Sequence, residues 1–230
     1  MSTTSTTRLC LVRHGETSWN AEGRVQGQTD VPLSELGHAQ ARAVAATLAG
    51  ERFEALYTSD LVRVRQTAQP AAETLGLAAR AEKNLRERHY GQFEALTYRE
   101  AKERFPEEYA RFRERDPEFD FGGGESLRAF QQRTIACVAA IAAQHPGAAV
   151  LVFTHGGVLE MVFRRAAGRT LSSARDFELP NAALNWVEIG AHDWRVQAWA
   201  KLDHLGSASG VPSGSSRLDT DPWHRLARRT

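Results

Sequence analysis

"LCLVRHGETSWN", residues 9–20, decides how this chain folds. Its first four residues, Leu9 to Val12, are all apolar, as in a strand that is buried on both faces. The run then stops at Arg13, His14 and Gly15. In an open α/β sheet, ligands bind beyond the carboxyl ends of the strands. The stretch therefore indicates either a strand that ends in an ordinary polar turn, or one that delivers an imidazole to a binding edge.

A second stretch repeats this pattern. Residues 148–157, AAVLVFTHGG, form another apolar run, which ends in His155 and two glycines. One histidine after a strand is usually a turn residue, whereas two in the same context favour a shared site. If the two strands are neighbours, His14 and His155 meet over one pocket. Arg13 disfavours a metal cation there and suits a bound anion, so no metal site is predicted.

The rest of the chain alternates between the two kinds of periodicity. Helical spacing of apolar residues covers 32–50, 61–76, 126–147 and 158–168, and Pro70 is expected to kink or break the second of these helices. Strand patterns cover 54–60, 183–190 and 194–202. We therefore predict an α/β fold, a three-layer sandwich with a mostly parallel central sheet and helices on both faces.

Residues 88–125 are crowded with charge, yet Phe105, Tyr109 and Phe112 fall on one helical face. This pattern predicts a helical insertion, here called a cap, laid over a core. Its aromatic residues indicate either a roomy pocket or packing of the cap on the core. Residues 1–205 are expected to form a single domain, followed by a Gly/Ser-rich tail over 206–230.

The composition of the chain limits which kinds of partner we expect it to bind. The 230 residues include 29 Lys and Arg against 28 Asp and Glu, a net charge of +1, so we expect no nucleic-acid or membrane partner. The two cysteines, Cys10 and Cys137, lie in apolar patterns and are expected to be buried thiols. No signal-peptide core or membrane span is apparent, which predicts a cytoplasmic protein. The oligomeric state stays open, with a homodimer among the options.

Residues 11–20, LVRHGETSWN, resemble the signature of the histidine phosphatase superfamily, the phosphoglycerate-mutase-like proteins. Five further pieces of the chain resemble the same family and follow in the family's order. They are RVQGQTDVPLSELGHAQA (24–41), SDLVRVRQTA (59–68), LRERHYGQFEALT (85–97), GGGESL (122–127) and VFTHGG (152–157). The resemblance spans most of residues 8–200, and it implies that the helical insertion over 88–125 lies over the active site and sets the substrate.

The resemblance implies a chemistry for particular residues. His14 would be the nucleophile and form a phosphohistidine, and Glu87 would protonate the leaving oxygen and then activate water. The phosphate pocket would comprise Arg13, Arg63 and His155. Substrate-binding residues would be Asn20, Gln26, Gly27, Arg65 and Gly156. Arginines would neutralise the phosphate, so neither a metal nor a cofactor is implied. Within these motifs, Arg65 is a rival for the role of Arg63, and Glu82 for that of Glu87.

Three functions, two of them enzymatic, are compatible with the motifs. GGGESLRAF resembles the phosphatase branch, and the residues after ERHYG depart from the mutases. We therefore favour a phosphomonoester hydrolase that acts on a small phosphorylated metabolite. The alternatives are a cofactor-dependent phosphoglycerate mutase, and a non-catalytic binding module from the same superfamily.

Overall fold

A six-stranded sheet forms the centre of the protein, whose computed structural model describes residues 5–191 and 193–206. The strand order is β3-β2-β4-β1-β5-β6. β3, β2, β4 and β1 are parallel, β5 pairs antiparallel with β1, and β6 pairs antiparallel with β5. Their bounds are β1 Thr7–Arg13, β2 Ala55–Thr58, β3 Ala79–Ala81, β4 Ala149–Thr154, β5 Leu184–Ile189 and β6 Trp194–Lys201. The predicted mostly parallel sheet is confirmed.

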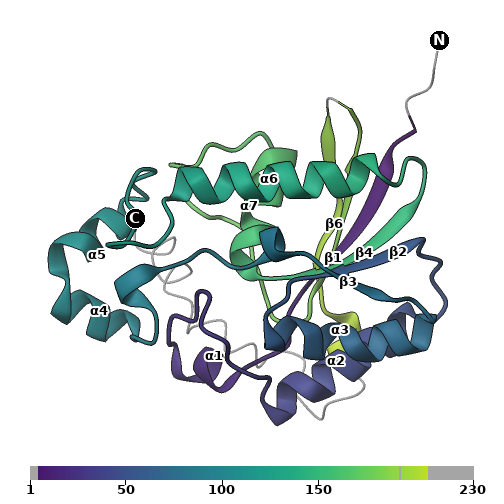
Figure 1. Cartoon of the computed structure of the whole chain (residues 1–230), viewed down its shortest axis with the longest axis horizontal. Helices are drawn as coiled ribbons and strands as arrows, with labels where there is room; N and C mark the ends of the chain where they lie inside the picture. Colours follow the sequence, from purple (N-terminus) through teal and green to yellow (C-terminus); the bar gives the residue numbers. More distant parts are fainter. Residues whose placement is uncertain (1–4, 192, 207–230) are drawn as a thin grey trace.

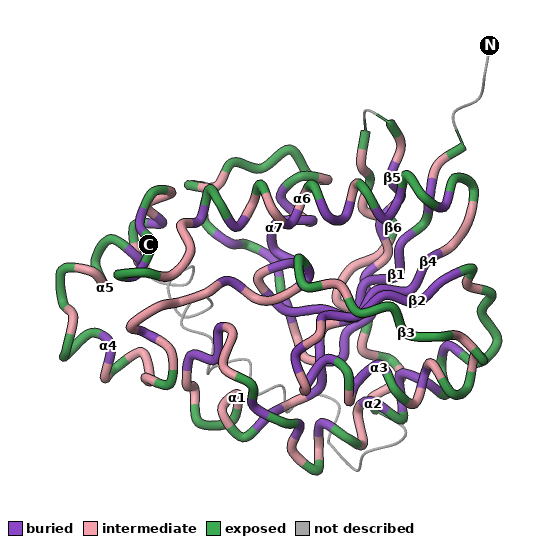
Figure 2. Tube along the Cα trace, viewed as in Figure 1, coloured by how far each residue is buried: buried purple, intermediate pink, exposed green. Residues whose placement is uncertain are grey.

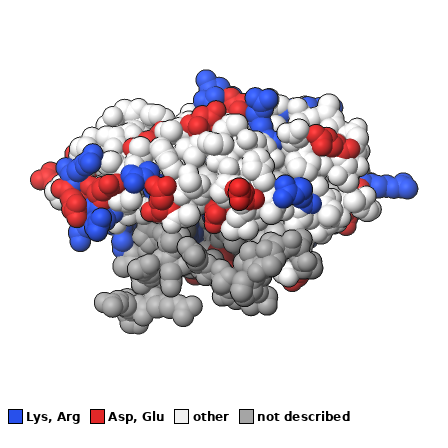
Figure 3. All heavy atoms as spheres, turned by 90° about the horizontal axis from the view of Figure 1, so that it is seen from below, with Lys and Arg blue, Asp and Glu red and all other residues white. Residues whose placement is uncertain are grey.

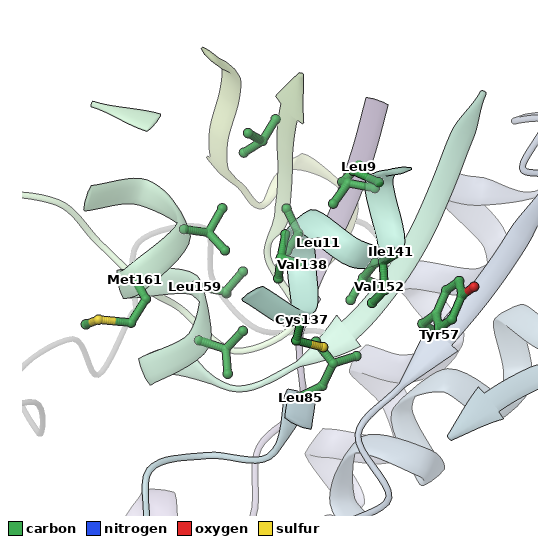
Figure 4. Packing of buried hydrophobic residues seen from close by; sticks show 14 of the residues in the cluster. Leu9, Leu11, Tyr57, Leu85, Cys137, Val138, Ile141, Val152, Leu159 and Met161 are labelled. Carbon is green, nitrogen blue, oxygen red and sulfur yellow. The ribbon is translucent and has the colours of Figure 1, made fainter. Parts of the chain in front are cut away.

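Helices cover both faces of this sheet (Figure 1). α6 (Leu127–Ala143) and α7 (Gly156–Ala166) lie on one face, and α2 (Glu35–Leu48) and α3 (Val62–Leu75) lie on the other. Successive side chains of a strand point to opposite faces. Accordingly, Leu9 and Leu11 of β1 pack with α6 and α7 (Figure 4), while Cys10 and Val12 pack with α2 and α3. The three-layer sandwich is therefore confirmed.

The central strands β1 and β4 are buried over their apolar runs, 9–12 and 150–153 (Figure 2). β1 and β4 lie in the middle of the sheet, so both of their faces and both of their edges are covered. This burial explains why the two strands have uninterrupted apolar runs rather than alternating patterns. The edge strand β3 is exposed and was not predicted, because its three residues have no apolar signal.

Two helices differ from the sequence-based expectation. Pro70 lies inside α3 but does not end it. Ala68 and Ala71, on either side of Pro70, are buried against the core, and this packing keeps the helix continuous. α6 ends at Ala143, before residue 147, where the apolar spacing placed its end, because the carbonyl of Ile141 already accepts a turn hydrogen bond from Gln144.

Residues 88–125 extend from one end of the sandwich and will be called the cap (Figure 1). The cap contains a short 3₁₀ turn, η2 (Gly91–Phe93), then α4 (Tyr98–Arg104) and α5 (Pro106–Arg113). Its aromatic side chains form a small core around Phe93, which includes Phe112, Phe119 and Phe121. Basic and acidic side chains are intermixed over this end of the molecule in the view of Figure 3.

The remaining elements are short. They are α1 (Ser18–Glu22), η1 (Lys83–Leu85) and η3 (Asp203–Leu205). Cys10 and Cys137 are buried free thiols, as predicted. Over the described ranges, every helix is too short or too polar to cross a membrane. The expected tail lies outside the described residues except for Gly206.

Candidate active site

The two histidines that follow apolar strands meet at the carboxyl ends of these strands. β1 and β4 are parallel neighbours, with Arg13 opposite Thr154 in the register. His14 and His155 are the next residues along each strand, and their ring centroids are 5.3 Å apart. The backbone N–H of His14 donates to the carbonyl of Thr154 at 2.9 Å, which continues the ladder into the site. The shared pocket expected from the sequence is therefore present.

The ring of His14 is fixed by the turn that follows it. His14 Nδ1 lies 2.8 Å from the carbonyl oxygen of Gly15, which can only accept a hydrogen bond. Nδ1 therefore carries the proton, and Nε2 keeps its lone pair. Burial lowers the pKa of His14 well below its ordinary value, and the charges of Arg63 and Arg13 lower it further. His14 is thus a neutral imidazole at neutral pH, as a nucleophile must be.

Two side chains from distant segments support this turn. Thr67, on α3, accepts a hydrogen bond from the N–H of Gly15 at 2.9 Å. Asn181 Nδ2 donates to the carbonyl of His14 at 2.9 Å and to that of Gly15 at 3.3 Å. Sequence reasoning missed Asn181. The only available signal was its place in a Pro-Asn turn before β5, which is too common to indicate a function.

Arg63 and His155 form a hydrogen-bonded pair beside His14. Arg63 is fully buried, and its Nη2 donates to His155 Nδ1 at 3.2 Å. His155 Nε2 then carries the proton and donates to Ser59 Oγ at 2.9 Å. Burial, followed by the charges of Arg63, His14 and Arg13, lowers the pKa of His155 well below its ordinary value. The site therefore contains two neutral imidazoles and two guanidiniums, which suits a dianion.

Glu87 reaches the same cavity from the loop after η1. Its two carboxylate oxygens accept backbone hydrogen bonds, Oε1 from Arg88 at 2.8 Å and Oε2 from Gly157 at 2.9 Å. Gly157 belongs to the first turn of α7, the helix that follows His155. The carboxylate is thus held by the same helix start that carries the second histidine. Glu82, its rival in the sequence, instead caps η1 through Asn84.

A cavity of about 140 Å³ lies over these groups. Most of the residues expected at the site line this cavity: Arg13, His14, Asn20, Gln26, Gly27, Arg63, Glu87 and Gly156. His155 lies behind them, in contact with Arg63 and His14. Gly156 leaves room for the Arg13 side chain, because a Cβ at position 156 would lie 3.3 Å from Arg13 Nε.

Arg65 is the exception, and its expected place at the site is corrected here. Its side chain is exposed on α3, and it does not line the cavity. Residues two apart on a helix point to different sides, so burial of Arg63 directs Arg65 outward.

Comparison with known proteins identifies the family. Residues 9–202 match the model of the histidine phosphatase superfamily, branch 1. The chain belongs to this superfamily. It is 39% identical over 211 residues to a metal-independent phosphoserine phosphatase of Arabidopsis thaliana, covering 90% of this chain and 87% of that protein. It is 38% identical to phosphoglycerate mutase-like protein 4 of the same plant, covering 90% of each.

A solved structure agrees with this assignment. Bacillus stearothermophilus YhfR superposes with a TM-score of 0.81 at 29% identity, covering 86% of this chain and 99% of that one. This histidine phosphatase is therefore an enzyme with the fold of its family, and the alternative of a non-catalytic binding module is set aside.

The cap side of the cavity contains charged residues that sequence reasoning missed. Arg88, Arg115, Glu160 and Arg175 line it and are all buried. Burial alone would raise the pKa of Glu160, but Arg115, Arg175 and Arg164 lower it below its ordinary value. In the sequence, Arg115 is one of many charges in the cap, and nothing there distinguishes it from the others. Only the fold reveals that it turns inward.

No group of three or more His, Cys, Asp or Glu side chains within residues 5–191 and 193–206 is arranged to hold a metal ion. The donors that line the cavity beside His14 include the guanidiniums of Arg13 and Arg63 and the amide of Asn20. Asn20 Oδ1 accepts from the N–H of Thr17 at 3.1 Å, which directs the donor end of the amide away from that contact. These groups fit a tetrahedral oxyanion bound against His14.

Proposed function

We propose that this histidine phosphatase hydrolyses small phosphomonoesters through a phosphohistidine on His14. One observation carries the proposal: the unprotonated Nε2 of His14 shares a cavity with two guanidiniums and the Glu87 carboxyl group. A phosphate monoester is a dianion, so a neutral nucleophile flanked by cations can approach it. Arg13 and Arg63 donate to the equatorial oxygens, where charge is concentrated in the transition state.

The reaction proceeds in two displacements. His14 Nε2 forms a bond to phosphorus as the bond from phosphorus to the ester oxygen breaks, and Glu87 gives its proton to that oxygen. Glu87, now a carboxylate, takes a proton from water as the water oxygen bonds to phosphorus. The N–P bond breaks, and inorganic phosphate and the original imidazole are released. Asn20, Gln26, Gly27 and Gly156 bind the substrate, and His155 holds Arg63.

The substrate is a small phosphorylated metabolite, and phosphoserine is the first candidate. A relative 39% identical over nine-tenths of this chain is named a metal-independent phosphoserine phosphatase. Tyr98, Phe112 and Phe119 line the cap side of the cavity and leave room for a modest organic group. We expect the enzyme to act in the cytoplasm, without a metal or organic cofactor, and a homodimer is an assembly to be tested.

Phosphoglycerate mutase activity is the alternative, and the 38% identical mutase-like relative supports it. A mutase must keep water from the phosphohistidine and pass the phosphoryl group to a second acid. Incubation with 3-phosphoglycerate and 2,3-bisphosphoglycerate separates the two activities. If 2-phosphoglycerate forms much faster than phosphate is released, the enzyme is a mutase and the proposed hydrolase activity is wrong.

The central test is a panel of monoesters, including phosphoserine, phosphorylated sugars, nucleotides and p-nitrophenyl phosphate, assayed for released phosphate. His14→Ala should abolish turnover, and rapid quenching of the wild type should show a mass increase on His14. His38→Ala is the matched control, because His38 is an exposed histidine on α2. Wild-type turnover by His14→Ala would refute the proposal.

A further inference from the structure

Segment 27–29, together with Gln26 before it, forms one wall of the cavity. Its shape depends on contacts with other parts of the chain. Gln26 and Gly27 line the cavity, and Gly27 has a positive φ of 51°. The carbonyls of this segment face the phosphate-binding arginine. Arg63 Nη2 donates to Gly27 O at 2.7 Å, and Arg63 Nη1 donates to Thr29 O at 2.9 Å. The orientation of the guanidinium therefore depends on where these two carbonyls lie, as well as on its contact with His155.

The amides of the same segment face Glu94, which follows the η2 turn in the cap. Glu94 Oε1 accepts from the N–H of Gln28 at 3.0 Å. Glu94 Oε2 accepts from the N–H of Thr29 at 3.1 Å and from its hydroxyl at 2.8 Å. Segment 27–29 is thus held on one side by a carboxylate and on the other by a guanidinium.

Glu94 also binds the cap itself. Its Oε1 accepts a further hydrogen bond from the N–H of Tyr90 at 3.0 Å, and its side chain is only 14% exposed. The fit is close, since a Cβ on Gly27 would lie 2.0 Å from Glu94 Oε1. The Glu94 carboxylate therefore joins segment 27–29 to the stretch around Tyr90, which directly follows Glu87 in the chain.

We propose that Glu94 is a positioning residue that holds Arg63 in register with the phosphate by clamping segment 27–29. This inference rests on the proposed function, because it assigns Arg63 to the phosphate. Glu94 itself does not line the cavity, so it acts through the segment and not on the substrate. An ionised carboxylate is suited to this task because both oxygens accept and neither donates.

The charge of Glu94 acts in the same direction as its hydrogen bonds. Burial lowers the pKa of Arg63 to about 10, and the negative charges of Glu87, Asp30 and Glu94 oppose this effect. Replacing Glu94 by glutamine removes the charge and puts an NH₂ group opposite donors that need an acceptor. Segment 27–29 must then shift, and the two carbonyls that orient Arg63 shift with it.

The test measures binding of orthovanadate, a phosphate analogue, by titration calorimetry, which needs no turnover. Glu94→Gln should weaken binding roughly 10- to 100-fold, because misplacing a positioning group by about 1 Å can cost a factor near 100. Glu103→Gln, an exposed glutamate of α4 in the same cap, is the matched control and should bind as the wild type does. Wild-type affinity in Glu94→Gln would overturn the inference.

A double-mutant cycle separates positioning of Arg63 from a general structural role. In an Arg63→Met background, Glu94→Gln should change orthovanadate affinity by less than about 2-fold, since the group it positions is gone. An equal loss in both backgrounds would overturn the inference. If Glu94→Gln does not fold, Thr29→Val removes only the 2.8 Å hydroxyl contact and should give a smaller loss, again only when Arg63 is present.

Failure of the proposed function can be distinguished from failure of this inference. If no monoester is hydrolysed by the wild type but orthovanadate binding follows the pattern above, the clamp stands and the hydrolase assignment fails. If monoesters are hydrolysed and the cycle shows equal losses, the assignment stands and the clamp fails.

Discussion

Replacing Gly157 by alanine should disable the proton donor while leaving the fold intact. A Cβ at this position would lie 2.1 Å from Glu87 Oε1, whereas ordinary contact begins at 3.4 Å, so the carboxylate must move by about 1.3 Å. The Phe130 ring, 3.0 Å from the same Cβ, limits movement of the backbone in its direction. Because Glu87 is a side-chain end that can swing away, the stability cost is small. Its hydrogen bonds to Arg88 and Gly157 are lost, however.

The magnitude follows from that displacement. A misplacement of about 1 Å can cost a factor near 100 in rate, which corresponds to about 2.7 kcal/mol of transition-state stabilisation. The loss should fall on esters with an alkyl leaving group, whose departing oxygen needs a proton. In kcat/KM, which reports the first displacement, p-nitrophenyl phosphate should be affected less than about 5-fold, because its leaving group departs as a stable anion.

The assay compares kcat/KM for the best alkyl monoester and for p-nitrophenyl phosphate in the wild type and in Gly157→Ala, because kcat also includes the second displacement, in which Glu87 activates water for both substrates. Gly50→Ala is the matched control, since nothing lies within 4 Å of a Cβ there. Thermal unfolding checks that Gly157→Ala remains folded. Equal losses for the two leaving groups, or wild-type turnover of the alkyl ester, would refute the role given to Glu87.

Three further predictions follow from the same geometry. Glu87→Gln should lower kcat for alkyl esters about 10²- to 10⁴-fold, measured by phosphate release, and a loss below 10-fold would contradict general acid catalysis. Burial lowers the pKa of His14 below the ordinary 6.5, so the unfolded state binds more protons below that pH. The free energy of unfolding should therefore fall as pH drops below 6.5, by at most about 1.4 kcal/mol per pH unit for this histidine. Urea titrations at several pH values should show a shallower fall in His14→Ala, and an unchanged slope would contradict the buried neutral form. Glu160→Ala should destabilise the protein by about 3–5 kcal/mol in the same assay, because it removes the carboxylate from among buried arginines, and a loss below 1 kcal/mol would show that the cluster is solvated.

The core elements were predictable because burial leaves a direct imprint on sequence. β1 and β4 are central and parallel, so both faces must be apolar, and the chain shows unbroken runs at 9–12 and 149–153. The helices of the sandwich were equally visible through their apolar spacing. β3 was missed because an exposed edge strand of three residues needs no apolar residue. The helix does not break at Pro70, because packing of the neighbouring alanines outweighs a missing N–H.

The candidate site was predictable where a motif ties a residue to a strand end or a helix start. His14, His155 and Glu87 converge because β1 and β4 pair and because α7 begins beside them. Arg65 was misplaced because the motif gives order along the chain but not the side of the helix from which a residue projects. Asn181 and Glu94 gave no signal of their roles, because each role exists only through contacts with segments more than 60 residues away.

By itself, the sequence determined the layers of the fold and the family, and it predicted two histidines at one site, because hydrophobic burial and the residues at strand ends are local properties of the chain. The tertiary structure decided which charges face the cavity. Arg115 and Arg175 turn inward to Glu160, Arg65 turns outward, and the carboxylate of Glu94 holds the wall that orients Arg63. Long flexible side chains take their direction from whatever packs around them, and no periodicity along the chain records that packing.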